Sequence, residues 1–327
     1  MMRALVVDRP GGPFRLAEVE RPVPAAGEAL VRIRASGVNP LDTKIRAGAA
    51  PHAKQPLPAI LGLDLAGEVE AVGPGVAGFK HGDEVYGLAG GVGGHQGSLA
   101  EFAAVDARLL ALKPGRFSMR EAAAMPLAFI TAWEGLVDRA RVGAGQKVLV
   151  QGGAGGVGHV AIQIARAFGA EVYATSSAGK RSIVEQLGAT AIDYDARSVE
   201  QYVAEHTGGA GFDIVYDSVG GAVLDASFKA VGRFGHVVSA LGWGTHALAP
   251  LSFKAGSYSG IFTLLPLLTG IGREHHGDIM REATRLADSG QLSVIVDPRN
   301  FTLETASEAH AAIENGNARG KLVIEID

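Results

Sequence analysis

A cluster of glycines between a short apolar run and a helical pattern constrains this chain most strongly. The stretch "VLVQGGAGGVGHVAIQIARAFGA" occupies residues 148–170, and Gly153, Gly155 and Gly158 match the pattern G-x-G-x-x-G. Between a strand and a helix, this pattern predicts a turn that binds a dinucleotide. The first glycine permits the tight turn, the second lets the backbone approach a pyrophosphate, and the third lets helix and strand pack closely. The alternative is a glycine-rich turn without a ligand.

The residues around this turn extend the prediction to a whole domain. Apolar runs such as "KVLVQG", "EVYATS", "FDIVYDSV" and "GHVVSALG" alternate with helical patterns from residue 147 onward. Such alternation predicts a parallel sheet covered by helices on both faces. A helix that starts in the glycine turn presents free N–H groups to an anion. The turn residues predicted to bind the cofactor are therefore Gly153, Gly155, Gly156, Val157 and Gly158.

The first third of the chain has a different texture. Short, partly alternating runs lie at 28–38, 65–73, 82–90 and 98–106, separated by glycine and proline. This spacing predicts a β-barrel or sandwich. Residues 117–140 are helical in pattern, and a terminal "GKLVIEID" indicates that the chain returns to its first domain. We therefore expect an α/β protein with a β-barrel domain (1–120 and 266–327) and an inserted, doubly wound parallel sheet (121–265).

Composition excludes several classes of function. A chain of 327 residues with a net charge of −4 has no basic stripe, so nucleic acid is not an expected partner. The absence of cysteine excludes disulfides and thiolate metal sites. No apolar run approaches the ~20 residues of a membrane helix, and the first residues lack the apolar core of a signal peptide. These features predict a cytoplasmic protein that does not enter the membrane.

The end of the second strand of the inserted sheet indicates which dinucleotide is bound. NAD-binding domains place an acidic residue there for the ribose hydroxyls. This chain instead reads Ser176 and Ser177, followed by Lys180 and Arg181. Two hydroxyls and two cations suit a 2′-phosphate, so the residues predict NADPH. The alternative for Lys180 and Arg181 is an exposed first helical turn.

The chain as a whole resembles the medium-chain dehydrogenase/reductase superfamily, and within it the zinc-independent quinone oxidoreductase branch. The resemblance rests on five motifs in order: "GVNPLDTKIRAG", "PAILGLDLAGEVEAVG", "GDEVYG", "LVQGGAGGVG" and "RGKLVIEI". It implies a GroES-like β domain with an inserted Rossmann domain. It also implies a homodimer joined through the nucleotide domains, and the segment 250–262 is predicted to form the strand-rich edge.

Departures from the zinc-dependent members of the family are informative. Those enzymes carry a cysteine where this chain has Asn39 or its neighbours, and a His-Glu pair where it reads Gly62, Leu63 and Asp64. Leucine cannot bind zinc, which needs Cys, His or carboxylate ligands. We therefore predict a protein without zinc, in which Asp64 is structural.

Three residues are predicted to take part in catalysis. The resemblance places Asn39 at the nicotinamide and the substrate, where it donates a hydrogen bond to the developing oxyanion; the alternative is an Asn-Pro turn. Asp42 lines the same cleft or serves as a helix N-cap. Thr131 matches a threonine near the nicotinamide ring, with back-bonding inside a helix as the alternative. His95, in the glycine-rich loop 87–98, is weighed as a proton donor and as an exposed histidine without a role.

Further cofactor contacts come from the ends of the other strands. The resemblance places Tyr194 near the 2′-phosphate. Val219 and Gly220 end the fourth strand and Leu241 follows the fifth, where backbone groups can hold the carboxamide.

The sequence therefore predicts an NADPH-dependent, zinc-independent reductase that transfers hydride to a quinone, a small-molecule substrate. A 2-enoyl or alkenal double-bond reductase is the alternative within the same superfamily. An NADPH-binding sensor or structural protein with little turnover is the alternative from another class, because fold does not fix function.

Overall fold

The chain divides into two compact units. The computed structural model describes residues 1–327. The terminal unit contains residues 1–127 and 264–327, and the central unit is the continuous segment 128–263. These boundaries differ from the 120/121 and 265/266 expected from the sequence pattern. The first boundary lies later because helix α2 (Met119–Ala123) packs against strands β3 (Glu28–Val38) and β5 (Asp64–Val72) of the terminal unit.

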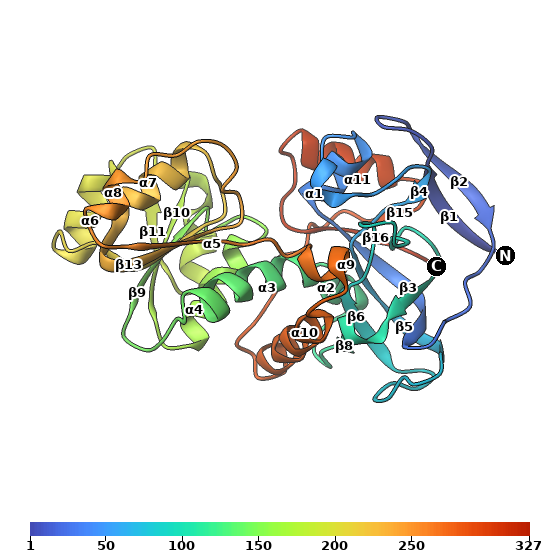
Figure 1. Ribbon diagram of the computed structural model, residues 1–327. Helices are drawn as coiled ribbons and strands as arrows, with labels where there is room; N and C mark the ends of the chain where they lie inside the picture. Colours follow the sequence, from blue (N-terminus) through green and yellow to red (C-terminus); the bar gives the residue numbers. More distant parts are fainter. The chain divides into compact units, whose positions relative to one another are not determined.

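The terminal unit is built on two β-sheets (Figure 1). The larger has seven strands, in the order β15-β16-β3-β5-β6-β8 with β7 also paired to β3, and the smaller has the order β2-β1-β4. The long strand β3 lies at the centre of this sheet, and most of its residues are buried. The remaining strands are β1 (Met2–Val7), β2 (Phe14–Val19), β4 (Ala59–Ile60), β6 (Glu84–Leu88), β7 (Phe102–Asp106), β8 (Leu110–Leu112), β15 (Phe301–Thr302) and β16 (Leu322–Glu325).

Strand β16 near the C-terminus and helix α2 complete this unit. Strand β16 pairs antiparallel with β3, so that Leu322 lies opposite Val38. Helix α2 begins at a capping box in which Ser118 accepts from the N–H of Glu121 and the Glu121 carboxylate accepts from Ser118. The other helices of the unit are α1 (Pro40–Arg46), α9 (Leu265–Thr269), α10 (Arg273–Asp288) and α11 (Ala306–Glu314).

The central unit is a six-stranded parallel sheet in the order β11-β10-β9-β12-β13-β14. The strand order reverses between β9 and β12, which is the arrangement of a doubly wound dinucleotide-binding sheet. Its interior strands are apolar because helices cover them. The strands are β9 (Lys147–Gln151), β10 (Glu171–Ser176), β11 (Thr190–Asp193), β12 (Phe212–Asp217), β13 (Val231–Ser239) and β14 (Ser257–Gly260).

Helices of the central unit pack on successive strands (Figure 1). Helix α4 packs against β9 and β10 and α5 against β11, whereas α7 packs against β12, β13 and α6. Helix α3 continues into a π-helical segment, Glu134–Arg139, where Gly135 approaches Tyr216 so closely that a Cβ atom would lie 2.5 Å from its ring. The helices are α3 (Pro126–Trp133), α4 (Gly158–Ala167), α5 (Arg181–Gln186), α6 (Val199–Thr207), α7 (Ala222–Ala230) and α8 (Ala249–Ser252).

The predicted fold class is confirmed, with one local difference. The strands predicted over 28–38, 65–73, 82–90 and 98–106 correspond to β3, β5, β6 and β7. The predicted strand-rich segment 250–262 is a strand only over Ser257–Gly260, and helix α8 precedes it. A proline near the start of a helix favours the helical state, because its fixed φ suits the first turn, and Pro250 occupies that position.

The edge strand β14 generates a prediction about assembly. It pairs with β13 on one side and has no neighbour in the sheet on the other, and an open edge is a template for pairing with a second copy across a two-fold axis. We expect light scattering at micromolar concentration to give the mass of a dimer. A Ser257→Lys variant should shift the mass toward the monomer, because a lysine on an edge strand opposes pairing. A monomeric mass for the unaltered protein would contradict the prediction.

Candidate active site

The glycine turn of the central unit has the geometry that a pyrophosphate requires. Gly152 takes the left-handed conformation, with a φ of +76°, and this residue rather than Gly153 makes the tight turn. A Cβ atom on Gly153 would lie 2.5 Å from the Ala174 side chain of β10, and one on Gly158 would lie 2.1 Å from the Gly152 carbonyl. Only the role expected for the first glycine therefore differs: Gly152 makes the turn and Gly153 packs against β10, whereas Gly158 allows the close approach expected of the third glycine.

Unused backbone donors mark where an anion fits. Gly155 N–H donates to the Gly152 carbonyl at 2.9 Å, whereas the N–H groups of Gly156, Val157 and Gly158 have no acceptor within the protein. These donors stand at the start of the ten-residue helix α4, whose N-cap residue Val157 has no capping side chain. Free N–H groups and the helix dipole together favour a phosphate there. The turn therefore fits the pyrophosphate of a dinucleotide.

The carboxyl end of β10 carries the residues predicted for the adenosine side. Ser176 is buried at the end of the strand, and Ser177 follows it, half-buried. Lys180 is exposed and makes no ion pair, whereas the Arg181 guanidinium is held by Glu185 at 3.0 Å. Lys180 is therefore the cation available to a phosphate.

The neighbouring strand β11 brings one predicted and one unpredicted residue to this edge. Tyr194 follows β11 and is 55% exposed, and its N–H lies 3.4 Å from the Ser176 carbonyl. Asp193, which lies opposite Ser176 in the sheet register, was not singled out from the sequence. Its carboxylate accepts from the N–H of Asp195 at 3.1 Å, so the acid is engaged by its own turn.

A buried aspartate organises the ends of β12 and β13. Asp217 is fully buried at the end of β12, and one carboxylate oxygen accepts from the N–H groups of Val219 and Gly220 at 3.0 Å. The other oxygen accepts from the Ser239 hydroxyl at 2.7 Å, and Ser239 Oγ in turn accepts from the N–H of Leu241 at 3.0 Å. One carboxylate thus fixes the three residues predicted to hold the carboxamide. Asp217 is not among the residues predicted from the sequence, although an acid at a strand end shortly before two glycines is a signal that could identify it.

Hydroxyl groups from two segments meet near helix α3. Thr131 is buried on α3, with its Oγ1 atom 3.2 Å from Thr263 Oγ1. The Thr263 hydroxyl lies 2.8 Å from a carboxylate oxygen of Glu134, at the first position of the π-helical segment. Tyr216 donates to the Thr131 carbonyl at 3.0 Å. Because π-helical turns occur frequently at functional sites, this row of polar groups keeps Thr131 a candidate residue.

The terminal unit brings Asn39 into a buried polar network. Asn39 is the N-cap residue of α1, and its Nδ2 atom donates to Asp64 Oδ2 at 2.9 Å. The buried Lys321 ammonium, on the segment before β16, donates to Asn39 Oδ1. A flipped amide would face NH₂ toward an ammonium and C=O toward a carboxylate, so these two charges fix the amide orientation. The sequence analysis named Asn39 and Asp64 but gave Lys321 no role.

Asp42 belongs to the same network. It is not the N-cap but the third residue of α1, where its Oδ2 atom accepts from the Asn39 N–H at 2.8 Å. Burial raises the pKa of Asp42 to about 8. Burial also raises the pKa of Asp64 to about 6, opposed by Lys321 and by the donors Asn39 and Leu127. Burial also lowers the pKa of Lys321, opposed by the charges of Asp64 and Asp42, so the three titratable groups of this cluster depend on one another.

His95 is engaged in the terminal unit by an arginine. It lies exposed in the loop before β7, and its Nε2 atom is 3.0 Å from an Arg273 nitrogen. Because a guanidinium only donates, His95 Nε2 accepts and the ring is neutral in this contact. Arg273 is also paired with Asp106 at 2.9 Å. In this arrangement, the accepting nitrogen of His95 carries no proton to give.

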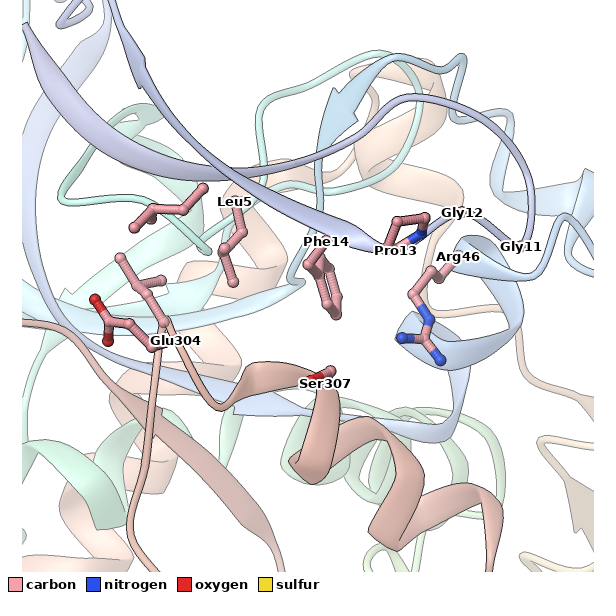
Figure 2. Close-up of a pocket in the computed structure, with 10 residues that line it drawn as sticks. Leu5, Gly11, Gly12, Pro13, Phe14, Arg46, Glu304 and Ser307 are labelled. Atoms are coloured by element: carbon pink, nitrogen blue, oxygen red, sulfur yellow. The ribbon is translucent and has the colours of Figure 1, made fainter.

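A surface cavity of about 500 Å³ lies elsewhere in this unit, between the β1–β2 hairpin and the start of α11 (Figure 2). Its polar side chains already have partners. Arg46 pairs with Glu314 at 3.0 Å and stands over the Phe14 ring, and Glu304 lies 3.5 Å from Arg3. The cavity therefore offers no unpaired charge to a ligand.

The residues around Leu63 do not include a set of metal ligands. Leu63 is fully buried where zinc-dependent members carry a ligand, and no group of three or more His, Cys, Asp or Glu side chains is arranged to hold a metal ion. None of the helices has the combination of length and apolar character that crossing a bilayer requires.

Comparison with known proteins identifies the family. The "Alcohol dehydrogenase GroES-like domain" family matches residues 25–115, and the "Zinc-binding dehydrogenase" family matches residues 187–324. The 2-methylene-furan-3-one reductase of Solanum lycopersicum is 39% identical over 91% of this chain and 71% of its own length. The chloroplastic NADPH-dependent alkenal/one oxidoreductase of Arabidopsis thaliana is 36% identical over 91% of this chain and 72% of its own length.

Solved structures agree with these relatives. An alcohol dehydrogenase superfamily protein from Novosphingobium aromaticivorans matches with a TM-score of 0.98 and 60% identity, over 100% of both chains. The quinone oxidoreductase from Coxiella burnetii matches with a TM-score of 0.82 and 30% identity, over 100% of this chain and 99% of the other. The chain is an oxidoreductase, and it belongs to the medium-chain dehydrogenase/reductase superfamily.

The free cation at the end of β10 gives a test of cofactor choice. Loss of one phosphate contact should cost about 1–3 kcal/mol, the scale of a charge-assisted hydrogen bond. Lys180→Ala should therefore weaken NADPH binding about tenfold or more and leave NADH binding nearly unchanged, as measured by titration calorimetry. Arg181→Ala is the matched control and should have a smaller effect, because Glu185 already holds that guanidinium. Equal losses for both cofactors in Lys180→Ala would show that this lysine does not contact the phosphate.

The buried carboxyl of Asp42 gives a test of pH dependence. Its folded pKa of about 8 lies above its unfolded value, so the folded form stays neutral while the unfolded form ionises. The wild type should lose stability from this group as pH rises through that window. Asp42→Asn, which removes the titration, should gain relative to the wild type by about 3 kcal/mol between about pH 5 and about pH 7.5 in urea unfolding.

The control for this test is Asp278→Asn, on the exposed face of α10. Its difference from the wild type should stay constant over the same range. A constant difference for Asp42→Asn would show that Asp42 is ionised in the folded protein.

Proposed function

We propose that this protein is an NADPH-dependent, zinc-independent reductase that transfers hydride to a carbon–carbon double bond conjugated with a carbonyl. Quinones, enones and alkenals all contain this group. The observation that carries the proposal is the glycine turn with three unused N–H donors, beside a strand end with two serines and the free cation Lys180. When bound there, NADPH supplies the hydride, and the protein supplies binding and orientation.

The chemistry of the acceptor explains why a metal is not needed in this proposal. A quinone or enone is electron-poor at the accepting carbon, so hydride addition moves negative charge onto the carbonyl oxygen through the conjugated system. We propose that Asn39 supports this oxygen with the second N–H of its amide, because Asp64 takes only the first. The enolate so formed takes a proton from water. In an enone this gives the saturated ketone, whereas a quinone adduct also loses the second hydrogen of the accepting carbon as a proton and gains one on oxygen, which gives the hydroquinone.

The relatives' names support the shared acceptor group rather than one member of it. Two relatives at 39% and 36% identity are named as enone or alkenal reductases, and a structure at 30% identity is named as a quinone oxidoreductase. NADPH is named for the Arabidopsis relative. We therefore propose conjugated carbonyl reduction as the activity, with enones and quinones as the two acceptor classes to be compared.

The test is a screen of NADPH oxidation with quinones, enones, alkenals and isolated aldehydes as acceptors. Conjugated acceptors should be reduced, isolated aldehydes should not, and exhaustive chelation should leave the rate unchanged. Loss of activity on chelation with recovery on adding zinc would contradict zinc independence. NADPH binding without turnover of any acceptor would favour a sensor or structural role.

Asn39→Ala should slow reduction measurably without abolishing it. Removal of one donor costs ~10²–10³ in rate where charge is localised on one oxygen, and less where it is spread through a ring. His95→Ala should change the rate little, since that ring accepts a bond from Arg273. Both rates are measured at a temperature where thermal unfolding shows each variant folded, because Asn39→Ala removes the side-chain donor to Asp64 Oδ2 and the side-chain acceptor of Lys321. An unchanged rate in Asn39→Ala would show that its amide is purely structural.

A further inference from the structure

The carboxyl ends of the parallel strands in the central sheet form two chemically different halves. The β10 side is polar, with Ser176, Ser177 and Lys180. On the other side of the reversal in strand order, apolar side chains remain accessible: Val219 after β12 is 47% exposed and Trp243 after β13 is 57% exposed. A dinucleotide lies across such a reversal, so the half opposite the adenosine side receives the hydride-donating end.

Trp243 stands on a loop that is anchored at both ends. At its start, Leu241 N–H is held by Ser239, which is itself bonded to the buried Asp217. At its far end, the His246 ring lies 2.9 Å from the Asp225 carboxylate. An indole on an anchored loop presents a defined surface, which lowers the cost of ordering it around a ligand.

Neighbouring groups hold the indole close to the sheet. The Trp243 and Phe262 rings lie edge to face, with centroids 6.4 Å apart and planes at 89°. A Cβ atom on Gly242 would lie 2.0 Å from the Tyr258 hydroxyl, so only a glycine lets the loop approach β14 this closely. Trp243 thus contacts Phe262 on one side, and more than half of its surface remains accessible.

We infer that Trp243 is a specificity-determining residue that selects flat, cyclic conjugated acceptors by stacking against their ring. The inference rests on the proposed function and narrows it: rings such as naphthoquinones or cyclic enones gain this contact, whereas acyclic alkenals do not. Aromatic pairs prefer offset-stacked or edge-to-face contact, and a pair of this kind changes an affinity about two- to tenfold. The titratable groups on this half already have partners: the Asp217 carboxylate is buried and bonded, and the His246 ring lies 2.9 Å from the Asp225 carboxylate.

The kinetic test compares a naphthoquinone with an acyclic 2-alkenal in wild type, Trp243→Ala and Trp243→Phe. Trp243→Ala should lower kcat/KM for the naphthoquinone about two- to tenfold, mainly through KM, and leave the alkenal nearly unchanged. Trp243→Phe should restore most of the loss, because it keeps an aromatic face. Phe253→Ala is the matched control. Phe253 is 89% exposed but precedes β14, so it lies at the amino ends of the parallel strands, away from Trp243. Equal losses for both acceptors would overturn the inference.

A binding measurement separates this inference from the proposed function. The chain has two tryptophans, and Trp133 is 7% exposed, so quenching by a bound ring reports chiefly on Trp243. With NADP⁺ present and no turnover, the naphthoquinone should quench wild-type emission along a saturating curve, and the saturating component should vanish in Trp243→Phe. Purely linear, collisional quenching would overturn the inference even if every acceptor is reduced. Saturable quenching with no reduction of any acceptor would support it while contradicting the proposed function.

Discussion

The terminal unit depends on one buried ammonium and the groups that surround it. Lys321 donates to Asn39, which lies 282 positions earlier in the chain, and Asn39 donates to Asp64. A buried charge is tolerated only when it is paired and hydrogen-bonded, so these contacts must form together. The same segment continues into β16, which pairs with β3 and places Leu322 opposite Val38. The Lys321–Asn39 contact and the pairing of β16 with β3 therefore occur at adjacent residues. The same segment that completes the sheet also fixes the orientation of the Asn39 amide.

The central unit uses a buried carboxylate in a comparable way. Asp217 takes donors from two loops and so sets the backbone on both sides of the strand ends where a nicotinamide is expected. The glycine turn has the reverse design: its donors Gly156, Val157 and Gly158 are left without acceptors inside the protein. The backbone groups bonded to Asp217 hold their loops in place, whereas the N–H groups of the glycine turn are left for a phosphate. This contrast follows from the cost of leaving a polar group unpaired, which a bound phosphate removes.

What could be read from the sequence depended on how local each constraint is. The glycine turn and β3 were predictable because close backbone approach and period-two burial leave their marks on adjacent residues. The partners of Asn39 were not, because Asp64 and Lys321 lie 25 and 282 positions away and meet only in the folded unit. Trp243 showed no periodic signal, and its interest comes from exposure that only the structure reveals. The segment 250–262 was misjudged in part because Pro250 starts a helix ahead of the edge strand.

The late position of β16 has a consequence for how the protein is made. During synthesis, β3 with Asn39 and Asp64 leaves the ribosome long before Lys321, and the whole central unit is translated in between. Until β16 arrives, residues 35–38 of β3 lack their strand partner on one side, and Asn39 lacks the Lys321 donor. The central sheet can form as a continuous segment in that interval, whereas the terminal unit must wait in an incomplete state. Residues 35–38 of β3 are therefore the part of this strand that gains its last partner only when the end of the chain has been made.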